Sequence, residues 1–300
     1  MLVILIMKIL GGLGVTVLEC NLNNGCHKKK KVILISDAHA DIPYCTNNKT
    51  KISDWIKNKM NKGYQILLEE VERKGVSLQE LWPDAKHTQE LKKLYLNNSF
   101  DIIPVDIRPH LILFSWQILN STNINEVKYK NKYEKIQFKT FLKRINDFFD
   151  EKSEFYNNSI KHLIKNKIKK NSGLGEHFRN LKYNFENYKR NNILLMDKMM
   201  SEIIKNNQDV LLKFDKLINQ LMEWYIILKL FSSEKDTIIH TGLFHSREIL
   251  NYLVNRYNFN IIYKDGINTT IKENMENCFT LPNNILNPEI VEIEKICNIL

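Results

Sequence analysis

The feature that most constrains the fold of this chain is a short apolar run that ends in ionisable side chains. Residues 32–35 read VILI, with no polar residue between them, and Asp37 and His39 follow almost at once. An unbroken run of β-branched residues and leucine is typical of a strand buried on both faces, as in a parallel sheet. Open α/β sheets bind ligands at the carboxyl ends of such strands. The run therefore predicts an α/β fold with a site near Asp37 and His39.

The same pattern of an apolar run followed by ionisable residues occurs three more times. The runs, with the residues that follow each, are 64–68 (Glu69, Glu70), 102–105 (Asp106, Arg108) and 237–239 (His240, His245). If the four strands are parallel neighbours, these side chains meet at one edge of one sheet. The expected catalytic residues are His39, Glu69, Arg108 and His245, the expected metal ligands are Asp37, His39, Glu69 and His245, and the secondary candidates are Glu70, Asp106, Lys229 and His240.

The segments between the runs predict helices. Residues 53–60 and 87–96 have helical patterns and complete a β-α-β-α-β series, which is typical of a parallel sheet. Between about residues 120 and 235 the apolar residues recur at helical spacing, which predicts a large all-helical insertion. A helix over 246–254, beginning just after His245, and a strand over 258–263 follow. We expect residues 31–300 to form a single α/β domain, with a mostly parallel central sheet that helices flank and the insertion interrupts.

Residues 1–30 form an apolar N-terminal segment that three structures could explain. Residues 15–18 could be a hairpin arm that returns as the strand at 32–35, and this alternative is favoured because a signal peptide carries its positive charge before the apolar run. A signal peptide or a membrane anchor through residues 1–18 are the alternatives. The five cysteines form no CxxC pair, which favours a reducing, cytoplasmic compartment.

The net charge of +10 does not by itself indicate a nucleic-acid partner. The lysines accompany many asparagine and isoleucine residues, as an AT-rich coding sequence produces, and net charge speaks to solubility more than to fold. The basic run at 162–170 lacks interleaved aromatic residues and is better explained as a solvated helix face. A small-molecule or peptide substrate is therefore favoured over nucleic acid. The alternative from a different class is a non-catalytic protein whose basic helices bind nucleic acid or a protein partner.

Two chemistries suit the expected residues. Imidazoles with carboxylates are the usual ligands of Zn²⁺, Mn²⁺ or Fe²⁺, and such a metal would activate water. Without a metal, a histidine or Glu69 could act as general base while Arg108 or Lys229 stabilises the developing anion. Both chemistries predict a hydrolase, and the sequence leaves them open.

The segment Ser36-Asp37-Ala38-His39 resembles the first motif of the calcineurin-like metallophosphoesterases, a strand followed by D-x-H. That family also has G-D-x-x-D, G-N-H-[DE] and G-H-x-H motifs, and the chain contains none of them. The resemblance covers about ten residues and implies phosphoesterase activity as an alternative function.

A broader resemblance is to the TIKI/TraB and erythromycin esterase/ChaN-like superfamily. The motifs that carry it read SDAH, ending in His39, LLEE, containing Glu69, and GLFH, from Gly242 to His245. The chain resembles a divergent member, with Ser36 and Asp37 where Gly and Glu are usual. The family's arginine before the second histidine motif is replaced by Lys229. The resemblance implies an α/β fold in which two histidines and a glutamate face one pocket, and a hydrolytic or metal-dependent activity.

Overall fold

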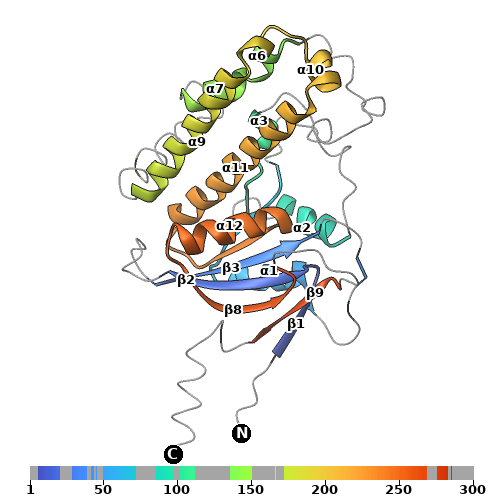
Figure 1. Cartoon of the computed structure of the whole chain (residues 1–300). Helices are drawn as coiled ribbons and strands as arrows, with labels where there is room; N and C mark the ends of the chain where they lie inside the picture. The colour runs from blue at the N-terminus through green and yellow to red at the C-terminus, as the bar shows by residue number, and fades with distance from the viewer. Residues whose placement is uncertain are drawn as a thin grey trace, which may run out of the picture. The chain divides into compact units, whose positions relative to one another are not determined.

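The computed structural model describes residues 6–20, 29–38, 42–43, 45, 50–71, 86–97, 102–111, 136–150, 166, 172–268, 276–282 and 285. They form a mixed α/β structure with one sheet of six strands and one of three, so the predicted α/β class is confirmed (Figure 1). The chain divides into two compact units. The sheet unit contains Met1–Glu69, Pro83–Ile103 and Ser233–Leu300, and the helical unit contains Glu70–Trp82 and Pro104–Ser232.

The six-stranded sheet has the strand order β6-β5-β7-β3-β2-β8. Its strands are β2 (Gly14–Cys20), β3 (Lys30–Asp37), β5 (Gln65–Leu68), β6 (Ile102–Pro104), β7 (Thr237–Gly242) and β8 (Asn260–Gly266). Strand β7 is parallel to both β3 and β5, whereas β2 is antiparallel to β3 and to β8. The late strand β7 therefore lies between the two early strands, and the residues that follow β3 and β5 flank its carboxyl end.

Strands β2 and β3 form the antiparallel pair that the hairpin alternative describes. Their pairing runs from Gly14 opposite Ser36 to Cys20 opposite Lys30. Strand β3 thus has β2 on one side and β7 on the other, and both faces of its apolar run are covered, because residues 32–35 are at most 1% exposed. Full burial explains why this run shows no polar alternation.

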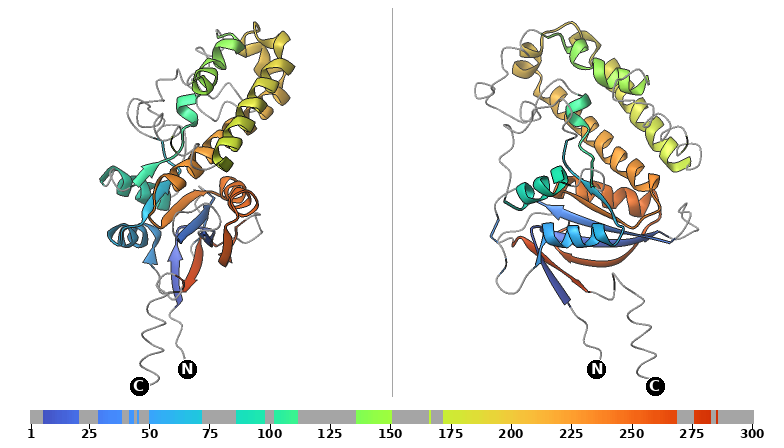
Figure 2. Two further views of the ribbon diagram at one scale, coloured as in Figure 1. Left: turned by 90° about the vertical axis from the view of Figure 1, so that its left-hand side faces the viewer. Right: turned by 180° about the vertical axis from the view of Figure 1, so that it is seen from behind.

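Helices cover both faces of the six-stranded sheet (Figure 2). Helices α1 (Ile52–Asn61) and α2 (Lys86–Asn97) lie on one face, where Trp55 and Ile56 join Ile33 and Ile35 in one apolar core. Helix α12 (Leu243–Asn255) packs on the other face against β3 and β7. The alternating side chains of β3 therefore enter two separate apolar layers, as the period of a strand requires.

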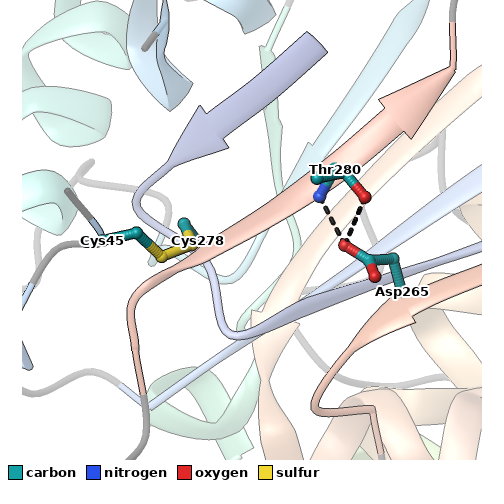
Figure 3. The surroundings of a disulfide bond; sticks show 4 residues. All are labelled: Cys45, Asp265, Cys278 and Thr280. Atoms are coloured by element: carbon teal, nitrogen blue, oxygen red, sulfur yellow. Dashed lines mark hydrogen bonds between the residues drawn. A yellow bond between two sulfur atoms is a disulfide. The ribbon is translucent and has the colours of Figure 1, made fainter. Parts of the chain in front are cut away.

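A three-stranded sheet of order β4-β1-β9 completes the sheet unit. Its strands are β1 (Ile6–Leu10), β4 (Thr50–Lys51) and β9 (Cys278–Pro282). The sequence pattern predicted no strand at β9. Asp265 on β8 binds this strand, because its Oδ2 accepts the Thr280 backbone N–H at 2.5 Å and the Thr280 hydroxyl at 2.7 Å (Figure 3). Strand β9 is thus held by β1 through the ladder and by β8 through this carboxylate.

In the helical unit, every described element after residue 107 is a helix. These helices are α3 (Arg108–Leu111), α6 (Phe138–Phe141), α7 (Lys143–Phe149), α9 (Ser172–Asn191), η3 (Ile193–Leu195), α10 (Met200–Asn206) and α11 (Gln208–Ser232). Trp224 is fully buried among aromatic rings, with centroids 4.8 Å from Phe178 and 6.5 Å from Phe148. Residues 120–135 and most of 151–171, where the helical insertion was also expected, lie outside the described residues. Among the described helices, none has the length and apolarity to cross a membrane.

Lys59 is a lysine on the buried face of α1. Helical spacing places it with Trp55 and Ile56, and it is only 3% exposed. Its Nζ lies 5.8 Å from the Trp55 ring centroid and 5.2 Å from that of Tyr64. Burial lowers the pKa of Lys59 from 10.5 to about 8, because the ammonium loses its water. Burial likewise raises the pKa of Tyr64 to about 12, so this phenol stays protonated while Lys59 titrates.

This lowered pKa predicts a pH-dependent stability. Between about pH 8 and 10.5 the unfolded chain holds a proton at Lys59 that the folded chain has lost, so stability rises with pH across this window. Near neutral pH we expect Lys59→Met to stabilise the fold by about 1 to 3 kcal/mol, a gain that vanishes by the upper end of the window. Urea unfolding across the window measures it, with Lys57→Met, at an exposed position of α1, as control for the lost charge. A gain independent of pH would contradict the prediction.

Candidate functional site

Glu69 and His245 form a buried carboxylate–imidazole pair in the sheet unit. The His245 Nε2 lies 3.6 Å from the Glu69 Oε1, and both side chains are 8% exposed. The other carboxylate oxygen, Oε2, accepts the Gly242 backbone N–H at 2.6 Å. One oxygen of Glu69 is therefore fixed by the backbone, and the other faces the imidazole across an ion-pair distance.

Local structure explains why His245 reaches Glu69. Strand β7 ends at Gly242, which is also the N-cap of α12, so that His245 lies in the first turn of this helix. The expectation that the helix begins just after His245 was wrong by three residues. The expected helix began at Ser246, whereas α12 begins at Leu243. Instead the Ser246 hydroxyl is buried beside Thr241 at 2.8 Å, and the Glu69 carboxylate binds the N–H at the true cap.

Asp37 forms a second buried pair with a histidine that the sequence pattern did not single out. Its Oδ1 lies 2.8 Å from the Nε2 of His87, and their side chains are 0% and 3% exposed. The same Oδ1 accepts the Ala38 backbone N–H at 2.7 Å. The Asn277 side-chain amide contacts the His87 Nδ1 at 3.3 Å. Asp37, His87 and Asn277 therefore form a continuous polar chain from the end of β3 to the residue before β9.

The sheet register places the two pairs on either side of the end of β7. Gly242 lies opposite Asp37 on β3, and the Glu69 backbone N–H donates to the His240 carbonyl at 3.0 Å. His240 itself is 1% exposed inside β7, opposite Ile35 and Leu68. The parallel strands thus bring Asp37, Glu69 and His245 to one carboxyl edge, where the sequence pattern expected them to gather.

Four other expected residues belong to the helical unit, namely Glu70, Asp106, Arg108 and Lys229. The guanidinium of Arg108 binds both carboxylate oxygens of Asp106, at 2.8 Å and 2.9 Å, and donates to the Asn219 Oδ1 at 3.1 Å. Arg108 and Asp106 are 5% and 9% exposed. The Lys229 Nζ lies 5.2 Å from the Tyr225 ring centroid. Arg108 therefore has a structural partner in Asp106, as in an ordinary buried ion pair.

His39, an expected catalytic residue and metal ligand, lies outside the described residues. Within the part of the chain that the structure describes, the single group of His, Cys, Asp and Glu side chains with metal-ligand spacing is Cys45, Glu276 and Cys278. Asp37 pairs with His87 and Glu69 pairs with His245, so these four side chains form two carboxylate–imidazole pairs rather than one such group. Cys45 and Cys278 are joined as a disulfide, which the absence of a CxxC pair did not suggest.

His87 and Asn277 had no signal in the sequence that could have marked them. His87 begins an amphipathic helix and Asn277 lies in a polar stretch, and neither follows an apolar run. Both approach Asp37 only through long-range packing, because His87 is 50 residues from Asp37 and 190 from Asn277. Short sequence patterns do not report contacts of this kind.

Comparisons with known proteins find no match: no family model, no curated protein and no solved structure matches this chain.

Proposed function

We propose that the carboxyl edge of β3, β7 and β5 is the active site of a hydrolase in which Glu69 and His245 act as the acid–base pair. The observation that carries this proposal is the buried contact of 3.6 Å between His245 Nε2 and Glu69 Oε1 at the turn between β7 and α12. Strand ends of open α/β sheets are the usual place for such groups. The resemblance to the TIKI/TraB and erythromycin esterase/ChaN-like superfamily supports the same residues, since Glu69 and His245 lie in two of its motifs.

In the proposed mechanism His245 accepts a proton from the attacking water, and the Glu69 carboxylate stabilises the imidazolium that forms. The Gly242 N–H holds one oxygen of Glu69, so the carboxylate keeps its orientation while the proton moves. Because both side chains are nearly buried, little water screens the charge between them. Asp37 and His87 supply a second pair of the same kind on the other side of Gly242. The substrate class under this proposal is a small molecule or a peptide.

Metal dependence is a further part of the proposal. Asp37, Glu69, His245 and His39 offer carboxylate and imidazole ligands that suit Mn²⁺, Zn²⁺ or Fe²⁺. In the described structure an oxygen of Asp37 contacts His87, and the two oxygens of Glu69 face the Gly242 backbone N–H and the His245 imidazole. A bound metal would lower the pKa of a water molecule. This part of the proposal depends on His39, and so does the alternative of a calcineurin-like phosphoesterase.

The proposal is tested by screening the purified chain against ester, amide, peptide and phosphoester substrates, with and without Mn²⁺ or Zn²⁺. We expect His245→Asn and Glu69→Gln to lower the rate by about 10²- to 10⁴-fold, the usual contribution of a positioned acid or base. Glu248→Gln, on the same helix and paired with Arg247, is the matched control and should keep the rate of the unchanged chain. Circular dichroism checks that each variant is folded.

Elemental mass spectrometry of the same preparations separates the two chemistries. Metal held by the unchanged chain and lost in His39→Ala and His245→Ala supports the metal-dependent form. Hydrolysis that needs no metal but fails in His245→Asn supports the acid–base form. Equal rates for the unchanged chain and His245→Asn would remove this pair from the mechanism.

A further inference from the structure

Cys45 and Cys278 bring two distant segments of the sheet unit together. They form a disulfide with a Cα–Cα distance of 6.0 Å across a sequence separation of 233 residues (Figure 3). The carboxylate of Glu276 is close to both sulfur atoms, because one ligand atom from each of the three residues lies within 4.8 Å of the others. Reduction of the disulfide would give two thiols beside this carboxylate, and two thiolates with a carboxylate are a ligand set for Zn²⁺.

The segment that carries Glu276 and Cys278 is firmly held. Strand β9 pairs with β1 from Ile6 opposite Pro282 to Leu10 opposite Cys278, and Thr280 is bound by Asp265. Cys45 is buried, with 2% exposure, so the surrounding protein shields it from water. The position is therefore ordered before any metal binds, which lowers the entropy that binding must overcome.

Asn277, between Glu276 and Cys278, links the disulfide to the polar chain of Asp37 and His87. The Asn277 backbone N–H donates to the Pro43 carbonyl at 2.9 Å, and its carbonyl accepts the Gly11 N–H at 3.1 Å. Its side chain contacts His87, which in turn contacts Asp37. A cross-link between Cys45 and Cys278 thus holds Asn277 against His87, whatever the chemical form of the cross-link.

We propose that Cys45, Cys278 and Glu276 form a redox-controlled Zn²⁺ site, which is a disulfide when oxidised and a metal site when reduced. A dithiol reductant breaks the S–S bond, becomes a disulfide itself and leaves two thiols. Zn²⁺ then displaces the two thiol protons and forms two Zn–S bonds, with a carboxylate oxygen of Glu276 as third ligand and water as fourth.

Modest side-chain movement is enough for this change. Tetrahedral Zn²⁺ with Zn–S bonds of about 2.3 Å needs sulfur atoms about 3.8 Å apart. Rotation about the Cα–Cβ bonds of the two cysteines supplies this separation. Zn²⁺ would then hold the same two segments that the disulfide holds, so the contact of Asn277 with His87 survives reduction. The site does not depend on the proposed hydrolase.

The test uses Co²⁺ as a spectroscopic probe of the full chain, kept without oxygen and reduced by a phosphine. We expect a near-ultraviolet thiolate-to-cobalt absorption band that one equivalent of Zn²⁺ removes, and no such band in the oxidised chain. Cys45→Ser and Cys278→Ser should lose the band, and Glu276→Gln should weaken Co²⁺ binding about tenfold or more. Cys20→Ser is the matched control, because Cys20 is also disulfide-bonded and should not affect the band.

The outcomes separate this site from the proposed hydrolase. His245→Asn and Glu69→Gln should keep the thiolate band, since neither residue belongs to the group of three. A reduced, unchanged chain that binds Co²⁺ without a thiolate band, or not at all, overturns the proposal. A band that persists in Cys45→Ser overturns it too. Cys20→Ser keeps both Cys45 and Cys278, so comparing its oxidised and reduced forms tests the site even if Cys45→Ser or Cys278→Ser fails to fold.

Discussion

Replacing Arg108 by methionine should destabilise the helical unit by about 3 to 5 kcal/mol. The guanidinium of Arg108 is bound in a fork by Asp106, whose Oδ1 also accepts the Arg108 backbone N–H at 3.1 Å. Both residues are nearly buried, at 5% and 9% exposure. The variant would leave the Asp106 carboxylate buried without its cation. Chemical unfolding followed by circular dichroism at the helical band measures the change.

Two controls show whether the loss comes from the buried charge. The double variant Arg108→Met with Asp106→Leu should regain most of the stability, because it removes the stranded carboxylate. Lys143→Met breaks an exposed ion pair with Asp147 and should cost less than about 1 kcal/mol. If Arg108→Met kept its stability but lost hydrolysis, the arginine would serve a substrate rather than the fold.

Removing the disulfide should cost the sheet unit about 2 to 5 kcal/mol. The bond closes a loop with a sequence separation of 233 residues, and long loops lose the most unfolded-state entropy when they are closed. We expect the double variant Cys45→Ser with Cys278→Ser to unfold at a lower urea concentration than the oxidised, unchanged chain. Phosphine reduction without added metal should lower the midpoint of the unchanged chain at least as far, because it also opens the disulfide of Cys20. Equal midpoints for the oxidised chain and the double variant would contradict this prediction.

The sequence predicted the elements with strong local patterns. The apolar run at 32–35 is part of β3, and the helical patterns at 53–60 and 87–96 correspond to α1 and α2. Glu69 and His245 were expected at the same sheet edge because each follows a strand, and the carboxyl ends of parallel strands share an edge. These predictions rest on the periods of strands and helices, which short stretches of sequence carry.

Long-range contacts account for what the sequence did not reveal. The disulfide joins residues that no motif relates, and β9 is a five-residue strand in a stretch that reads as polar and irregular. Arg108 was expected to stabilise a developing anion, and in the described structure its guanidinium binds Asp106 and Asn219. Asp106 is only two residues from Arg108, whereas Asn219 is 111 residues away and reaches the guanidinium through packing that the sequence pattern does not report.

The position of β7 has a consequence for how the chain acquires its structure during synthesis. Strands β3 and β5 leave the ribosome early, but the strand that pairs with both begins only at Thr237. Until β7 is made, the edges of β3 and β5 that pair with it in the sheet have no β7 to bind. Unpaired edges of apolar strands promote aggregation. Contacts over such long sequence separations also make folding slow. Glu69 and His245 therefore meet only in a late step, after most of the polypeptide has been made.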